Sequence, residues 1–228
     1  MDGRSVRWEA HNAAQRTRIV DSAIALIEQT GDLPPLLDVG RHAGVSRSVL
    51  YRQFADRNDL EQAVRTRGME MFWEAFEPVL TLQGTVRESL KRGAAAYVNW
   101  AREHRHLHQR ADQNPTEGSE LQRSIDLVAD QIASLLVMSF RAAGADVTDA
   151  DVEATDPLTH GLINGIYSTV RRWLARGGRV PDAEHLIDLV VEAVEALIGS
   201  RATAFGIPVN FDAPVATLIP SAPVPSEQ

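Results

Sequence analysis

Apolar residues recur at steps of three and four along almost the whole chain, which is the period of an amphipathic helix. The first such stripe consists of Ile19, Val20, Ala23, Ile24 and Ile27. The same period predicts four long helices, over residues 85–103, 119–143, 156–176 and 182–204. No alternation of apolar and polar positions bounded by turn residues marks a strand, so the chain is expected to be all-α.

Between this stripe and the long helices, the pattern predicts shorter helices joined by sharp turns. The first helix is expected to start near Asn12 and to stop at Gly31, leaving an N-terminal arm. A short helix then ends at Gly44, because glycine readily adopts the left-handed conformation of a tight turn. Ser46 and Asp56 stand where the N-caps of the next two helices are expected.

The segment DVGRHAGVSRSVLYRQFADRNDL, residues 38–60, has the pattern of a helix-turn-helix. In its second helix, Val49, Leu50 and Phe54 share an apolar face, whereas Arg47 stands in the polar first turn. Small polar and arginine side chains at a helix N-terminus suit the major groove of DNA. The segment therefore predicts a DNA-reading unit.

The string AGVSRSVLYRQF, followed by ADRNDL, resembles the signature of the tetracycline-repressor (TetR) family of transcriptional regulators. The resemblance covers residues 16–62. It implies a three-helix helix-turn-helix DNA-binding domain with its arm over 1–62 and a larger helical ligand-binding and dimerisation domain over 63–206. Residues 207–228, which are rich in proline, are expected to form an extended or disordered tail.

The resemblance also assigns partners and site residues. Family members are homodimers that bind double-stranded operator DNA and pair through their last two long helices. Arg47 and Ser48 are expected at base edges, and the residues expected near phosphates are Ser46, Tyr51, Arg52 and Arg57. Four arginines of the arm region could reach an adjacent groove: Arg4, Arg7, Arg16 and Arg18.

Three features depart from the family pattern. Pro34 and Pro35 stand where a hydroxyl side chain would contact phosphate. Gly40 occupies a usual alanine position, and glycine within a helix costs about 0.5–1 kcal/mol, so a weak second helix is expected. Arg57 replaces lysine and keeps the ability to hold a phosphate.

Composition narrows the function further. The chain has 228 residues, a formal net charge of −8 and no cysteine, which excludes a disulfide scaffold and a thiolate zinc site. The first 65 residues are charge-balanced and the remainder is acidic, which is compatible with a DNA reader attached to an acidic body but does not require one. No membrane-spanning run or secretion signal is evident, so a cytoplasmic protein without a membrane partner is expected.

Bulky residues in the C-terminal region predict a pocket for a largely apolar small-molecule inducer. The candidate lining residues are Trp73, Phe76, Tyr97, Trp100, His104, Met138, Phe140, Asn164, Tyr167 and Trp173. The polar side chains of Asn99 or His160 could also orient the ligand in this pocket. A stripe of aromatic residues can also belong to the hydrophobic core without lining a ligand site, and that alternative stays open.

The last two helices carry apolar stripes that predict a four-helix bundle across a two-fold axis. The stripe of the first comprises Leu158, Leu162, Ile166 and Val170, and that of the second comprises Leu186, Val190, Val194 and Leu197. Gly161 and Gly165 would let a second backbone approach closely. Packing within one chain is the alternative.

His104, His108 and Asp112 would share a helical face, a spacing that suits zinc or nickel. Arginines surround them and favour solvent-facing histidines, so neither a metal nor another cofactor is expected. No HExxH, GxSxG, phosphate loop or dinucleotide fingerprint is found, so no enzyme is expected.

The leading hypothesis is a ligand-responsive bacterial transcriptional regulator, a repressor released from its operator by an apolar molecule. The alternatives are a helical small-molecule-binding protein and a ligand-independent architectural DNA-binding protein.

Overall fold

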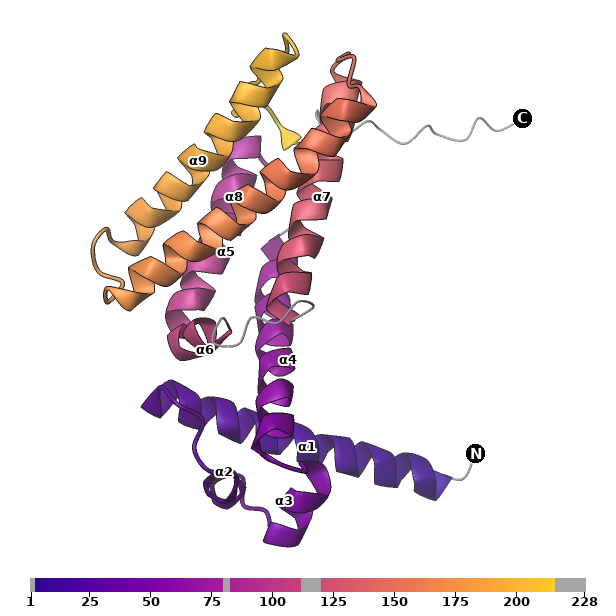
Figure 1. The fold of residues 1–228 in the computed structure, drawn as a ribbon, viewed down its shortest axis with the longest axis vertical. Helices are drawn as coiled ribbons and strands as arrows, with labels where there is room; N and C mark the ends of the chain where they lie inside the picture. Colours follow the sequence, from indigo (N-terminus) through magenta and orange to yellow (C-terminus); the bar gives the residue numbers. More distant parts are fainter. Residues whose placement is uncertain (1–2, 80–82, 112–119, 216–228) are drawn as a thin grey trace. The chain divides into compact units, whose positions relative to one another are not determined.

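The computed structural model describes residues 3–79, 83–111 and 120–215, which form helices joined by short connections (Figure 1). The helices are α1 (Gly3–Thr30), α2 (Leu36–His42), α3 (Arg47–Gln53), α4 (Arg57–Phe76), the 3-10 helix η1 (Glu77–Val79), α5 (Val86–Glu103), α6 (Arg105–Arg110), α7 (Glu120–Ala142), α8 (Asp149–Ala175) and α9 (Ala183–Ala204). Within these ranges the extended pairing is a single bridge between Thr85 and Pro214. The all-α prediction is confirmed.

The chain folds as two compact units. The first unit takes its described residues from 1–73 and 104–120, and the second takes them from 74–103 and 121–228. The boundary between the units falls after Trp73, within α4, whereas a boundary after residue 62 was expected. Helix α6 belongs to the first unit, although the helices before and after it, α5 and α7, belong to the second. A short helix that returns to an earlier domain leaves no signal in local periodicity.

The core of the first unit is built from the predicted stripe of α1. Ile19, Ala23 and Ile27 are fully buried and belong to one apolar cluster with Val39 of α2 and Leu60 of α4. Helices α2, α3 and α6 have only six or seven residues each. Helices this short are not stable alone, so their stability depends on this shared core.

The first helix begins at Gly3 and is continuous to Thr30, so the expected start near Asn12 and the separate N-terminal arm are wrong. The stretch WEAHNAAQR contains neither glycine nor proline and includes several good helix formers. Nothing in it interrupts the helix. At the other end, Gly31 adopts the positive φ of 81° expected of a helix-terminating glycine.

The second unit is organised around α5, which packs along α9 and also contacts α8. Val98, Val170 and Trp173 are buried in its apolar cluster, together with Leu186 of α9. Helix α8 starts at Asp149, before the predicted residue 156, because Thr148 and Asp151 form a capping box. Asp182 caps α9 by accepting a hydrogen bond from the amide of His185.

The described part of the predicted tail is bound to the second unit. The amides of Val86 and Arg87 donate to the carbonyls of Ala213 and Phe211, at 3.1 and 2.9 Å. Arg87 also pairs with Asp212 at 3.1 Å. Residues 207–215 follow the last helix and are held to the second unit by these contacts, whereas residues 216–228 lie outside the described ranges.

Over the described ranges, the helices lack the combination of length and apolar character that crossing a membrane requires.

Candidate nucleic-acid interface

The turn between α2 and α3 forms as the local sequence predicts. Gly44 has a φ of 65°, the left-handed conformation that glycine adopts without a steric penalty. Ser46 is the N-cap of α3, and its Oγ atom accepts a hydrogen bond from the amide of Val49 at 3.4 Å. Asp56 accepts one from the amide of Asp59 at 2.9 Å and so caps α4.

Helix α3 buries one face and exposes the other. Leu50 and Gln53 are buried, whereas Ser46, Arg47, Ser48 and Tyr51 are exposed and form what we call the reading surface. The Arg47 guanidinium lies over the Tyr51 ring, 5.5 Å from its centroid, and the Ser46 and Ser48 hydroxyls are 3.0 Å apart. The sequence thus brings together the residues expected to contact DNA.

Two further predicted phosphate contacts flank the reading surface. Arg52 is exposed, and its guanidinium lies 3.5 Å from the side-chain oxygen of Gln15. Arg57 is exposed in the first turn of α4, where its guanidinium lies 3.7 Å from the carboxylate of Asp32. Neither pair is buried, so both guanidinium groups remain within reach of an anion.

Arg16 has a different role from the DNA contact that was considered for it. Its guanidinium donates to the backbone carbonyl of Gln53 and to Asp59, the latter at 3.0 Å. It also lies over the ring of Phe54, 4.2 Å from the centroid. Arg16 therefore ties α1 to the end of α3 and the start of α4. Arg18 is exposed on α1, and the side chains of Arg4 and Arg7 are outside the described set.

Two residues that join α6 to the other helices of the first unit were not predicted. The carboxylate of Glu28 accepts hydrogen bonds from the amides of His106 and Leu107 at 3.4 and 3.2 Å. Arg110 bonds Asp32 at 2.7 Å and Glu61 at 2.9 Å. These residues are far apart in the sequence, so no local motif could have revealed them.

The environment of Asp32 favours its charged form. The amide of Leu33 and the guanidinium of Arg110 donate to the carboxylate, and both contacts lower the pKa of Asp32. An ionised Asp32 is therefore available to Arg110 and, at longer range, to Arg57.

The candidate pocket residues are divided between the two units. Trp73 and His104 belong to the first unit and the others to the second. Trp173 is buried and its indole donates to the carbonyl of Pro181 at 2.7 Å, and Phe140 packs against Phe205 with 5.4 Å between centroids. Both rings are thus packed in the interior of the second unit.

The remaining candidate pocket residues differ in how far they are exposed to solvent. Met138 is 50% exposed and lines an open groove of about 410 Å³ on α7. Phe76, Trp100 and Asn164 are half-buried. Burial raises the pKa of the Tyr97 phenol well above its usual value, and the neighbouring phenol of Tyr167 raises it further. Tyr97 and Tyr167 are both half-buried residues of the second unit.

The residues of the two predicted dimer stripes differ in burial. Three members are buried within the chain and leave little side-chain surface for a partner, namely Val170, Leu186 and Val190. The half-buried members are Leu162, Ile166, Val194 and Leu197. Leu158 is 40% exposed. Gly161 and Gly165 are exposed, and a β-carbon added at either would meet no atom within 4 Å.

The residues considered as metal ligands have different surroundings. His108 is buried, His104 precedes α6 as its N-cap residue, and Asp112 lies outside the described ranges. His106, between them, contacts the backbone carbonyl of Glu28 through Nδ1 at 3.0 Å.

Comparison with known proteins supports the helix-turn-helix. An uncharacterized HTH-type transcriptional regulator of Mycobacterium tuberculosis (strain ATCC 25618 / H37Rv) is 41% identical over 66 residues, which are 29% of this chain and 28% of that protein. The matched part is thus well under two thirds of the relative's length. No protein-family model matches the chain.

Two solved structures share the fold over most of the chain. A TetR-family transcriptional regulator from Streptomyces coelicolor has a TM-score of 0.66 at 21% identity, covering 90% of this chain and 88% of that one. A TetR-like transcriptional regulator from Rhodococcus sp. RHA1 has a TM-score of 0.60 at 20% identity, covering 82% and 97%. The chain therefore has the fold of the TetR-family transcriptional regulators.

Proposed function

We propose that this protein is a DNA-binding transcriptional regulator of the TetR type that acts as a homodimer and responds to a small molecule. The observation that carries the proposal is the reading surface. Four polar side chains capable of contacting DNA are exposed at the start of a helix whose opposite face is buried. Such a helix can enter the major groove without unfolding the domain that carries it.

In this proposal, base contacts and backbone contacts come from different residues. Arg47 and Ser48, in the first turn of α3, reach base edges. Tyr51 of the reading surface, with the flanking Arg52 and Arg57, holds phosphates and so fixes the register of the helix on the duplex.

Dimerisation through α8 and α9 is supported by the apolar surface left open on them. Leu158 of α8 and Leu189 of α9 are 40% and 43% exposed, and the open glycines of α8 permit close backbone contact. Pairing two chains would present two reading surfaces to successive major grooves, about 34–36 Å apart.

Ligand response is supported by the interior of the second unit. Tyr97, Trp100 and Tyr167 lie partly or wholly buried at or near its core, a surrounding suited to an apolar ligand with a few polar groups. A ligand that favours a different spacing of the two reading surfaces would release the operator, which is the action of a repressor. The protein has no enzymatic role in this proposal and acts in the cytoplasm.

The decisive experiment is selection of DNA bound by the full chain from a random pool, followed by affinity measurements on the recovered site. We expect a two-fold symmetric site, and Arg47→Ala should lower discrimination against random DNA by about 1–3 kcal/mol. Arg102→Ala, at an exposed arginine of α5, is the control and should leave discrimination unchanged.

Two results would contradict the proposal. Recovery of no preferred sequence would favour an architectural DNA-binding protein or a helical protein that binds small molecules only. Discrimination that survives Arg47→Ala would mean that the reading surface does not read bases.

A further inference from the structure

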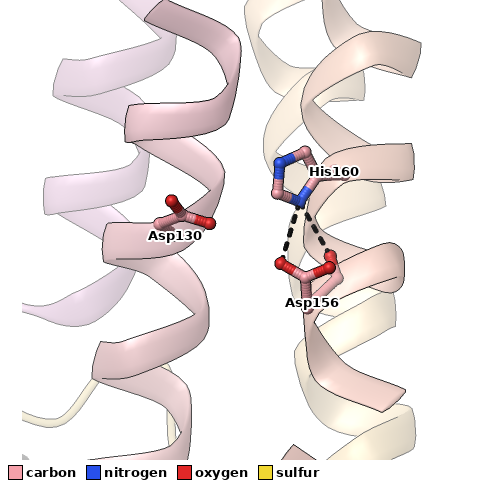
Figure 2. A group of neighbouring side chains, drawn as sticks. All are labelled: Asp130, Asp156 and His160. Carbon is pink, nitrogen blue, oxygen red and sulfur yellow. Dashed lines mark hydrogen bonds and ion pairs between the residues drawn. The ribbon is translucent and has the colours of Figure 1, made fainter. Parts of the chain in front are cut away.

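A histidine and three aspartates meet between α7 and α8 in the second unit. The group comprises Asp126 and Asp130 of α7 and Asp156 and His160 of α8. Figure 2 shows Asp130 facing the His160 and Asp156 side chains across the gap between the two helices. One ligand atom each from Asp130, Asp156 and His160 lies within 4.8 Å of the other two. None of these residues belongs to the reading surface or to the predicted dimer stripes.

The imidazole of His160 is oriented by its own helix. Its Nδ1 atom lies 3.0 Å from the backbone carbonyl oxygen of Asp156, and a carbonyl oxygen can only accept, so Nδ1 carries the hydrogen. The lone pair of a neutral ring is then on Nε2. A backbone carbonyl that fixes the tautomer in this way is the usual outer contact of a metal-binding histidine.

The exposed nitrogen faces carboxylates of the other helix. Nε2 of His160 lies 3.4 Å from Oδ1 of Asp126, and Asp130 stands one helical turn further along α7. In a site with metal–ligand bonds of about 2.0–2.2 Å, neighbouring ligand atoms are about 3.0–3.5 Å apart. The spacing of Asp126 and Nε2 therefore suits a shared cation. The carboxylate of Asp156 lies 3.4 Å from Nδ1, and rotation of the Asp130 and Asp156 side chains would bring their oxygens to the same cation.

The charges of the group also favour a cation. Carboxylates lie close to both ring nitrogens of His160, since Asp126 is 3.4 Å from Nε2 and Asp156 is 3.4 Å from Nδ1. Asp130 adds a third carboxylate to the group. A divalent cation would offset the negative charge that these carboxylates bring together.

We propose that His160, Asp130 and Asp156, with Asp126 beside them, bind one divalent transition-metal cation of the zinc class between α7 and α8. An imidazole nitrogen with carboxylate oxygens is a donor set that suits zinc and its neighbours in the first transition row, whereas magnesium and calcium take oxygen ligands. Because the donors come from two helices, the bound cation joins α7 to α8.

The test uses the full chain after dialysis against EDTA and removal of the chelator, titrated with zinc chloride in a calorimeter. We expect saturable binding with at least one ion per chain and a rise in the melting temperature on zinc addition. His160→Ala and Asp130→Asn should each remove one ion or weaken its binding at least tenfold. His185→Ala, which removes an exposed histidine of α9, is the matched control and should bind as the wild type does.

Three results would overturn the proposal. The first is the absence of binding and of stabilisation at 100-fold excess of zinc. The second is zinc binding by both His160→Ala and Asp130→Asn equal to that of the wild type. The third is magnesium binding that is as tight as zinc binding and is unchanged in His160→Ala, which would mean an acidic surface without a nitrogen ligand. Asp130→Asn alters one exposed side chain without changing its size, so it provides the answer if His160→Ala does not fold.

Discussion

A β-carbon added to Gly40 would lie 2.8 Å from the Cδ2 atom of Leu50. Gly40 is in α2 and Leu50 is in α3, and both residues are buried. The missing side chain of Gly40 therefore lets the two helices of the helix-turn-helix approach closely. Leu50 is 1% exposed, so it has little room to move away from a larger residue.

We expect Gly40→Ala to destabilise the protein. The clash with Leu50 should cost about 1–3 kcal/mol, as other overpacked cores do, and the better helix propensity of alanine returns about 0.5–1 kcal/mol. The net loss, about 1 kcal/mol, is measurable by urea unfolding. Gly68→Ala is the control, because the added β-carbon there meets only Leu107 at 4.0 Å. It should stabilise the protein slightly, and equal stability of the two variants would contradict the argument.

Gly40 also shows which kind of contact cannot be predicted from the sequence. Gly40 alone indicates only a weakened helix, whereas its benefit depends on Leu50, which approaches it in space. Gly44, Ser46 and Asp56 were predicted correctly because each acts on backbone groups within three residues of itself. Local chemistry of this kind determined the helix-turn-helix and its exposed residues.

Contacts between distant segments could not be predicted in that way. Arg16 resembles a free arm residue in the sequence, yet its partners Gln53 and Asp59 follow it by 37 and 43 positions. Periodicity also cannot tell which neighbour covers an apolar face. Val170 and Leu186 fit a dimer stripe by spacing, but α5 supplies the core that buries them.

Glu28→Ala should loosen α6. The Glu28 carboxylate caps the first amides of α6, a helix for which His104 at the N-cap provides no side-chain hydrogen bond. Loss of a cap costs about 0.5–2 kcal/mol. Hydrogen exchange of the Leu107 amide should become several-fold faster. Gln29→Ala removes the exposed neighbour on α1 and should leave this rate unchanged. Equal protection in Glu28→Ala and wild type would assign the capping to another group.

Arg57→Ala should weaken binding to specific and random DNA alike. A residue that holds a phosphate contributes through counterion release, so its removal reduces the slope of log K against log salt by about one unit. Fluorescence anisotropy over a series of salt concentrations measures this slope. Arg102→Ala is again the control. A change in sequence discrimination with an unchanged slope would place Arg57 at a base edge instead.

Gly165→Arg should break the proposed homodimer. An arginine at this open position of α8 adds bulk and charge where a second backbone is expected, and it meets no atom of its own chain near the β-carbon. Sedimentation at micromolar concentration should give the mass of a dimer for the wild type and of a monomer for the variant. Gly165→Ala is the matched control and should remain dimeric. A monomeric wild type, or a dimeric Gly165→Arg, would exclude this face as the interface.

Stability should depend on pH through His160. Its folded pKa is raised above the ordinary value of 6.5, chiefly by the Asp156 carbonyl, so the folded state binds the proton more tightly than the unfolded state does. The resulting stabilisation is complete below pH 6.5 and is lost as the pH rises through the folded pKa. With EDTA present, wild type should therefore exceed His160→Gln in melting temperature by more at pH 5.5 than at pH 8.5. His185→Gln controls for the loss of a histidine from the same unit. A difference that stays constant with pH, or that grows toward pH 8.5, would show that the aspartates around His160 do not favour its protonated form.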